Sequence, residues 1–295
     1  MSQGQATGAA NFEPHRRALT GLAYRMLGSV SDAQDIVQDA YLRWHRIDPA
    51  TITDPRAWLI RTVTRLCLDE LKSARARRET YVGPWLPEPV ADAETLTADT
   101  ESDLADDVSV ALLLALERLS PLERAAFLLH DVFEQDFSHI GIALNRTPAA
   151  CRQLATRART HIRTSPPRFR PSAADTARLV GAFMQAALAN DVAGLTSMLA
   201  TDAELHSDGG GIRIAALNVI RGNDRVARFI AGIARKSGQL MHTMPAELNG
   251  LPGFLLREPD GTMRTLAFDI NNGQIQTLYI VANPQKLRHL EPPPV

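Results

Sequence analysis

The sequence predicts a multidomain chain with two all-α domains followed by one α+β domain. Up to about residue 163, apolar residues recur at helical spacing and the segments open on capping residues. In the last third, short strand-like runs alternate with hairpin-turn signals. Prolines mark the two boundaries, within residues 80–107 and at residues 166–171. With 295 residues, the chain is long enough for this many domains.

Composition narrows the class of protein. The formal net charge is −1, so only the distribution of charge can point to a partner. No apolar run approaches the ~18 residues that span a bilayer, and residues 1–10 lack a signal-peptide pattern. Cys67 and Cys151 stand alone on predicted helices, which indicates buried thiols in a reducing cytosol. We therefore expect a cytoplasmic protein that uses no metal or other cofactor.

The second predicted helix carries an acidic face. A first helix runs from Phe12 to Leu27 and stops at Gly28. The second opens on a capping box at residues 31–34 and continues to about Arg46. Three polar side chains share its exposed side: Asp35, Gln38 and Asp39. Without further context, the simplest interpretation of this acidic face is a surface exposed to solvent.

The third predicted helix, from Arg56 to Arg78, is amphipathic and basic. It holds seven basic residues against two acids, Asp69 and Glu70. A basic helical surface suits a phosphate backbone, so this is one candidate nucleic-acid surface. Its best candidates for backbone contact are Arg56, Arg61, Arg65 and Lys72.

A helix-turn-helix follows later in the chain. Ser120-Pro121 opens the first of three helices, Ser138 caps the second, and Thr147-Pro148 opens the third. The short turn at residues 145–146 matches the motif. The third helix has a small apolar stripe that can pack closely: Cys151, Ala155, Ala158 and Ile162.

The opposite side of that third helix is basic. From residue 137 to residue 174 there are seven arginines and no acid, and arginine and glutamine suit base edges. The candidate DNA contacts are Arg146, Arg152, Gln153, Thr156 and Arg157. A solvated basic helix in an all-α domain remains the simpler alternative, although two basic modules in one chain favour DNA.

Residues 80–107 read as an acidic linker that contains prolines. Eight acids and no base lie between Glu88 and Asp107, a composition that stays extended or disordered. The apolar cluster Trp85, Leu86 and Pro87 is unusual in a solvated linker. We expect this cluster to dock on another part of the chain.

The last third reads as α+β, with helices on one face of a curved sheet of antiparallel strands. Helices are expected at residues 175–188, 191–199 and 224–235, and turns at residues 258–261 and 272–273. The expected strands cover residues 203–207, 240–248, 253–257, 263–271 and 274–281.

Two interpretations of this domain's polar residues stay open. A general acid–base site could be built from His206, Asp208, His242, Asp269 and Tyr279, although no spacing among them is diagnostic. Alternatively, Asp208 with Gly209, Gly210 and Gly211 forms a turn that another backbone segment approaches closely. Glycine triplets serve close approach more often than acid–base chemistry, which favours the turn.

Three stretches carry a family resemblance: residues 32–44, 54–61 and 116–127. In this order, they resemble the polymerase-binding helix, the −10 reading module and the −35 reading module of the extracytoplasmic-function (ECF) sigma factors, the promoter-specificity subunits of bacterial RNA polymerase. Residues 85–89, 208–211 and 283–287 further resemble the marks of the SigJ-like group, which has a SnoaL-like C-terminal extension.

The resemblance implies a domain plan. Residues 11–79 would be sigma region 2, residues 80–107 the linker, and residues 108–165 the region 4 helix-turn-helix. Residues 173–290 would be a cone-shaped α+β domain of the SnoaL-like, or NTF2-like, class. The implied partners are core RNA polymerase and promoter DNA at the −10 and −35 elements, without a membrane; a small-molecule ligand of the C-terminal domain stays open.

The resemblance also assigns roles to residues, with no catalytic residue among them. Asp35, Gln38 and Asp39 would bind polymerase, and the basic residues of both modules would bind DNA. The interdomain regulatory set would be Trp85, Leu86, Pro87, Asp208, Gly209, Gly210, Gly211, Asn283, Pro284, Lys286 and Leu287. The resulting prediction is a non-enzymatic sigma factor regulated in cis. The alternatives are a helix-turn-helix regulator with a ligand-sensing domain, or a sigma factor whose extension is also an isomerase or cyclase.

Overall fold

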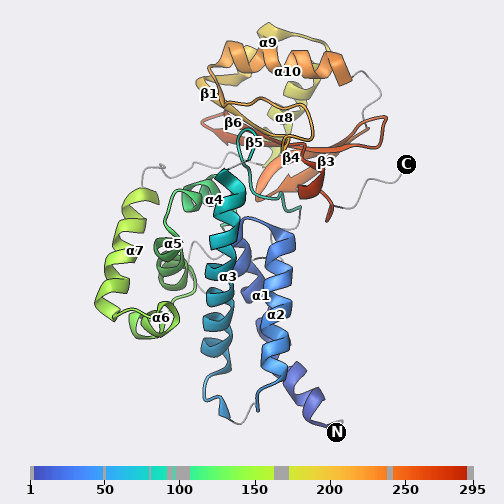
Figure 1. The fold of residues 1–295 in the computed structure, drawn as a ribbon. Coiled ribbons are helices and arrows are strands. Elements are labelled where there is room, and N and C mark those ends of the chain that lie inside the picture. Colours follow the sequence, from blue (N-terminus) through green and yellow to red (C-terminus); the bar gives the residue numbers. More distant parts are fainter. Residues whose placement is uncertain are drawn as a thin grey trace. The chain divides into compact units, whose positions relative to one another are not determined.

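The computed structural model describes residues 3–48, 51–79, 81–91, 96, 107–162, 173–237 and 242–290. Within these, it does not describe the side chains of residues 3–11, 73–79, 173 and 237. The chain forms two compact units (Figure 1). The first consists of Met1–Glu79 with Asp92–Ser165, and the second of Thr80–Ala91 with Pro166–Val295.

The first unit opens with three helices: α1 (Gln3–Leu27), α2 (Val30–His45) and α3 (Pro55–Glu79). Gly28 ends α1 with φ of 69°, as expected. The predicted capping box at residues 31–34 is wrong. Ser29 is the cap of α2, because its side chain accepts the Asp32 N–H and its backbone is extended.

The second half of this unit contains α4 (Val110–Glu117), α5 (Pro121–Phe127), the π-helix η3 (Leu128–Val132), α6 (Phe137–Leu144) and α7 (Pro148–Ile162). The predicted caps Ser120 of α5 and Thr147 of α7 are confirmed, and Glu123 completes a capping box with Ser120. The predicted Ser138 cap is wrong, since the Asp136 carboxylate accepts the N–H groups of Ser138 and His139 and so begins α6. Both predicted buried thiols are free and buried.

The second unit is an α+β domain. Its helices are α8 (Ala173–Leu188), α9 (Val192–Met198), α10 (Asn223–Ser237) and the short η4 (Pro284–Lys286). Its strands are β1 (Leu199–Asp208), β2 (Ile220–Arg221), β3 (His242–Leu248), β4 (Leu251–Arg257), β5 (Met263–Asn271) and β6 (Gln274–Val281).

The six strands form one sheet in the order β2-β1-β6-β5-β4-β3. The expectation of purely antiparallel pairing is wrong at one place, because β1 pairs with β6 in parallel. A parallel pair needs a long crossover, and here the crossover is all of the chain between the two strands. The turn at Asn272-Gly273, with φ of 51° and 73°, confirms the predicted hairpin between β5 and β6.

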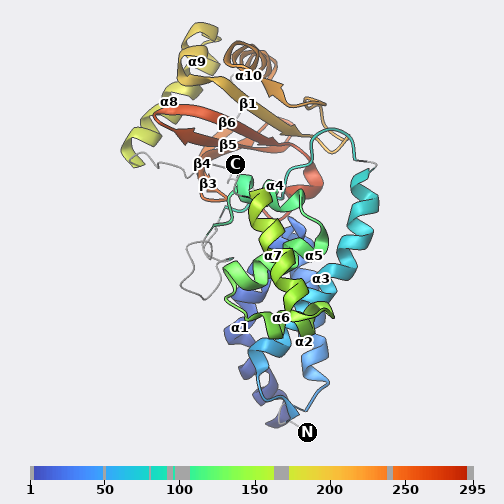
Figure 2. The same ribbon diagram turned by 90° about the vertical axis from the view of Figure 1, so that its left-hand side faces the viewer.

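The core of this domain lies between the sheet and helices α8, α9 and α10, which cover one face of the sheet in both views (Figures 1 and 2). Phe183 of α8, Leu195 of α9 and Phe268 of β5 are fully buried there. Because side chains alternate along a strand, the polar residues between these core positions face the other side of the sheet.

Residues 80–107 are divided between the two units. Residues 80–91 belong with the α+β domain, while Leu96 is buried in the helical unit, where its carbonyl accepts from Arg25 at 2.6 Å. Most of residues 92–106 lies outside the described part of the chain. Among the described residues, no helix is long and apolar enough to cross a membrane.

Candidate functional site

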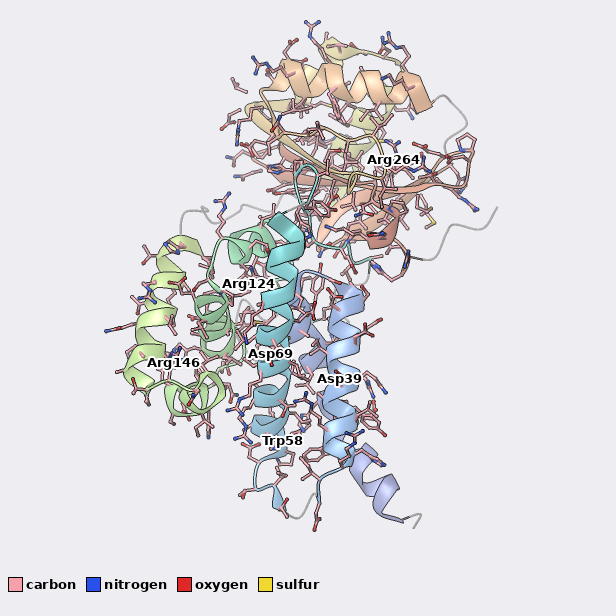
Figure 3. All side chains as sticks on the ribbon, viewed as in Figure 1. Asp39, Trp58, Asp69, Arg124, Arg146 and Arg264 are labelled. Atoms are coloured by element: carbon pink, nitrogen blue, oxygen red, sulfur yellow. The ribbon has the colours of Figure 1, made fainter. Side chains whose placement is uncertain are left out.

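The predicted polymerase face lies along α2. Asp35, Gln38 and Asp39 are exposed, whereas the intervening Ile36 and Val37 are buried against α1 and α3. The carboxylate of Asp39 points outward from the helix (Figure 3). The helix therefore presents the acidic surface that the sequence predicted, on a rigid element.

The basic side chains of α3 have mixed surroundings. Arg56 and Arg61 are half-buried, and the exposed Lys72 pairs with Asp69 at 2.7 Å. Trp58, labelled in Figure 3, is half-buried near the N-terminal end of α3. Its ring lies 5.5 Å from that of Trp44, so it contributes to packing between α3 and α2.

Arg65 contacts the helix-turn-helix in this structure. Its guanidinium donates to the carbonyls of Ile142 at 2.7 Å and Ala143 at 3.1 Å. These carbonyls lie in the last turn of α6, where intrahelical partners are lacking. Arg65 therefore joins the predicted −10 module to the predicted −35 module.

A second arginine makes the same connection from inside the unit. Arg124, labelled in Figure 3, lies on α5. Its side chain is buried, with 3% of the residue exposed. It donates to the carbonyls of Met26 at 2.6 Å and Leu116 at 2.9 Å, and pairs with Glu117 at 2.6 Å. Because Met26 lies in the last turn of α1, this buried charge links α5 to α1.

The candidate DNA-reading face of α7 is exposed. Its four candidate residues and Ala149 line one open surface groove: Arg152, Gln153, Thr156 and Arg157. The opposite stripe of Cys151, Ala155 and Ala158 is fully buried. Arg146 lies at the turn before α7 and donates to the Asn145 carbonyl (Figure 3).

Residues 81–90 dock on the α+β domain around the buried carboxylate of Asp208. Asp208 accepts from the Tyr81 hydroxyl at 2.6 Å, the Leu86 N–H at 2.9 Å and the Gly210 N–H at 3.0 Å. Lys286 Nζ completes the set at 2.8 Å. Asp208 is 0% exposed, so these donors replace the water that the carboxylate has lost.

Lys286 is the cationic partner in the same network. It is 7% exposed and also donates to the Leu86 carbonyl. Its ammonium lies 4.3 Å from the centre of the Trp85 ring and 5.0 Å from that of Tyr81, at cation–π distance. The lysine thus connects the C-terminal tail, the glycine turn and the linker in one buried contact.

Tyr81 keeps its proton in this setting. Burial first, and then the hydrogen bond and charge of Asp208, raise the pKa of its phenol far above the ordinary range. The neutral hydroxyl donates to Asp208 and accepts from Asn283 Nδ2 at 2.9 Å.

The far end of the docked segment is held as well. Val90 and Asn249 exchange two hydrogen bonds, at 3.0 Å and 2.8 Å. The His289 ring lies 2.7 Å from the Pro89 carbonyl, so the tail contacts the linker here. Leu86 through Val90 are all buried.

The glycine triplet serves close approach, as the favoured interpretation held. A Cβ on Gly209 would lie 2.2 Å from the Arg213 carbonyl, and one on Gly211 would lie 3.2 Å from Val82. A Cβ on Gly210 would lie 2.2 Å from Asn283 Nδ2. Gly210 and Gly211 also have φ of 61° and 71°, which favours glycine.

Gly210→Ala should therefore weaken docking of the linker. The methyl group would displace Asn283, which orders the Tyr81 hydroxyl, and the left-handed backbone adds strain of about 1–3 kcal/mol. Hydrogen exchange of the Leu86 amide should speed up. Gly232→Ala on α10, where a Cβ meets nothing within 4 Å, is the matched control. Unchanged exchange in Gly210→Ala would contradict this account of the turn.

The five acid–base candidates do not converge on one site. The rings of His206 and Tyr279 lie 5.5 Å apart, on the sheet face opposite the apolar core. Asp269 shares that face, whereas Asp208 is engaged by the linker and Lys286, and His242 is exposed at the start of β3. Among the described residues, no cluster of His, Cys, Asp and Glu is arranged to hold a metal ion.

Several contact residues were not predicted from the sequence. Tyr81, Asn249 and His289 hold the linker, and Phe137 and Glu123 contact the arginines of α7. Tyr81 carried a signal because it stands near the apolar linker cluster, and His289 because it lies in a tail of alternating apolar and basic residues. The other contacts depend on tertiary placement.

The family models match both helical modules. Sigma-70 region 2 matches residues 12–77 and Sigma-70 region 4 matches residues 109–162. ECF RNA polymerase sigma factor SigJ of Mycobacterium tuberculosis is 39% identical over 293 residues, covering 94% of this chain and 92% of that protein. Probable ECF RNA polymerase sigma factor SigI of the same species is 33% identical over 289 residues, covering 97% of each.

The fold agrees with these sequence matches. The crystal structure of the M. tuberculosis sigma factor SigJ matches with a TM-score of 0.73 and 36% sequence identity, covering 95% of this chain and 98% of that chain. The chain belongs to the ECF sigma factors of bacterial RNA polymerase. Its third domain is the expected α+β domain, with helices α8, α9 and α10 on one face of a six-stranded sheet.

Proposed function

We propose that this ECF sigma factor binds core polymerase through the acidic face of α2 and reads promoter DNA through α3 and α7. We propose further that its C-terminal domain controls that activity in cis. The observation that carries the regulatory part is the docked linker, whose residues 81–90 are bound through a fully buried ion pair.

The polymerase contact follows from the charge of α2. Carboxylates on a rigid, exposed helix attract a basic partner surface, and reversing such a charge produces like-charge repulsion. Asp35 and Asp39 meet this condition, and neither is part of the core.

Asp35→Lys should weaken binding to core polymerase by about tenfold or more, the effect of roughly 1.4 kcal/mol. The fold should survive because the side chain is exposed. The measurement is a titration of core polymerase with labelled protein, followed by promoter-specific transcription in vitro. Asp202→Lys, an equally exposed reversal on β1, is the control. If Asp35→Lys binds core polymerase with wild-type affinity, α2 is not the polymerase contact.

DNA reading requires the two modules to separate. The −10 and −35 elements are about 25 base pairs apart, roughly 85 Å along DNA at 3.4 Å per base pair. A compact unit of about 150 residues has a radius of gyration of about 15 Å. Modules joined by Arg65 and Arg124 therefore cannot reach both elements at once, and the packed unit is a resting state.

The docked linker restricts that separation. Residues 81–90 are bound to the C-terminal domain and Leu96 is buried in the helical unit. Residues 97–106 then form the connection to region 4, and ten extended residues reach at most about 33–36 Å. Undocking of residues 81–90 together with release of Leu96 from Arg25 makes the whole linker available and lengthens this reach. We expect the docked linker to lower promoter-specific transcription, and release of the linker to raise it.

A regulatory role suits the C-terminal domain better than catalysis. Asp208, the one fully buried candidate acid, is saturated by four donors that include the linker. A tethered contact of this kind can be shifted by a ligand or by polymerase, as a switch requires.

A further inference from the structure

The candidate reading arginine of α7 is held by an aromatic ring before any DNA is bound. The guanidinium carbon of Arg152 lies 5.0 Å from the centre of the Phe137 ring. Phe137 is the first residue of α6, so the contact crosses the turn between the two helices of the helix-turn-helix. Arg152 itself is exposed and lines the groove on α7.

The ring is fixed in turn by a histidine. The His130 imidazole lies 4.1 Å from the Phe137 ring, with an interplanar angle of 33°. His130 belongs to the π-helix η3, after which Glu134 has φ of 55° and reverses the chain. This reversal brings the Gln135 carbonyl within 2.9 Å of His130 Nδ1, which donates to it.

This contact lowers the conformational entropy that Arg152 loses when it binds a base. An exposed arginine has many rotamers, and a bidentate contact to guanine requires one of them. A side chain held in place beforehand loses less freedom on binding, so affinity for the correct base rises. The contact is weak enough that the guanidinium can still turn toward a base edge.

We infer that Phe137 is a positioning residue for promoter recognition: its ring, held by His130, orients Arg152 for base contact. The inference rests on the proposed role of Arg152 in reading the −35 element. No other described residue of α6 has a ring contact with an arginine of α7.

The test uses holoenzyme assembled from the full chain and core polymerase, with a randomised duplex library as the probe. Phe137→Leu should lower discrimination by about two- to fivefold at one or two base positions, the strength of an exposed cation–π contact. Phe137→Tyr, which keeps the aromatic face, should select the wild-type motif. Ile142→Ala, which removes an exposed apolar side chain from the same helix, is the matched control.

A double substitution separates positioning from packing. In an Arg152→Ala background, Phe137→Leu should have no further effect on the selected motif. An equal loss in that background would show that the ring supports the helix and would overturn the inference, as would a wild-type motif in Phe137→Leu alone. If Arg152→Ala itself leaves the motif unchanged, the assignment of Arg152 as a reader fails, and the positioning role fails with it.

Discussion

Lys286→Met is expected to release the linker from the C-terminal domain. Methionine has similar length and no charge, so Asp208 would be left buried without its cation. Removing one partner of a buried ion pair costs about 3–5 kcal/mol. The same change removes the donor to the Leu86 carbonyl and the cation over the Trp85 ring.

Hydrogen exchange measures this release directly. The amides of Leu86 and Val90 donate to Asp208 and Asn249, so they exchange only when the segment opens. Their exchange should become faster by about a hundredfold or more. Lys236→Met, on the exposed side of α10, should leave both amides unchanged.

Transcription gives the functional outcome of the same variant. If the docked linker limits the reach between the modules, Lys286→Met should raise promoter-specific transcription. Trp85→Ala should do so to a smaller degree, because it leaves the ion pair in place. Faster exchange together with unchanged transcription would show that docking is structural. Unchanged exchange would contradict the energetic account of the ion pair.

The sequence predicted the elements well where local signals set them. Ser120 with Glu123 is a complete capping box, and Asn272-Gly273 fixes the β5–β6 hairpin by its backbone preference. The errors occurred where two candidates compete within a few residues. Asp136 precedes Ser138 and a charged carboxylate accepts two N–H groups, so it takes the cap of α6.

Long-range pairing could not be derived from local pattern. The parallel contact of β1 with β6 joins residues more than 70 positions apart, and nothing near Leu205 signals Leu278. The linker illustrates both cases. Its apolar cluster predicted docking, and the glycine turn predicted close approach, but Asn249 was found only through the fold.

Removal of the buried Arg124 should lower the stability of the packing between the region 2 and region 4 modules. Arg124→Leu keeps apolar volume on α5 but removes the guanidinium that donates to the carbonyls of Met26 and Leu116. It also removes the ion pair between Arg124 and Glu117, whose side chain is 18% exposed. The expected loss is about 3–5 kcal/mol.

Thermal unfolding of the full chain should show this loss in the transition of the helical unit. For a unit of about 150 residues, 1 kcal/mol corresponds to roughly 2–4 °C, so the midpoint should fall by about 6–20 °C. Arg118→Leu, at the exposed residue directly after Glu117, should shift it little. The double variant Arg124→Leu with Glu117→Leu should recover part of the loss, because no unpaired charge remains buried.

The same variant tests whether the packed unit is a resting state. Arg124 connects α5 to the end of α1, so its loss favours separated modules over packed ones. At a temperature where Arg124→Leu is still folded, binding to core polymerase should become faster, since fewer contacts have to break beforehand. Slower binding by a folded Arg124→Leu protein would mean that polymerase binds the packed arrangement. The two DNA-reading modules would then have to separate after binding, with polymerase supplying the energy.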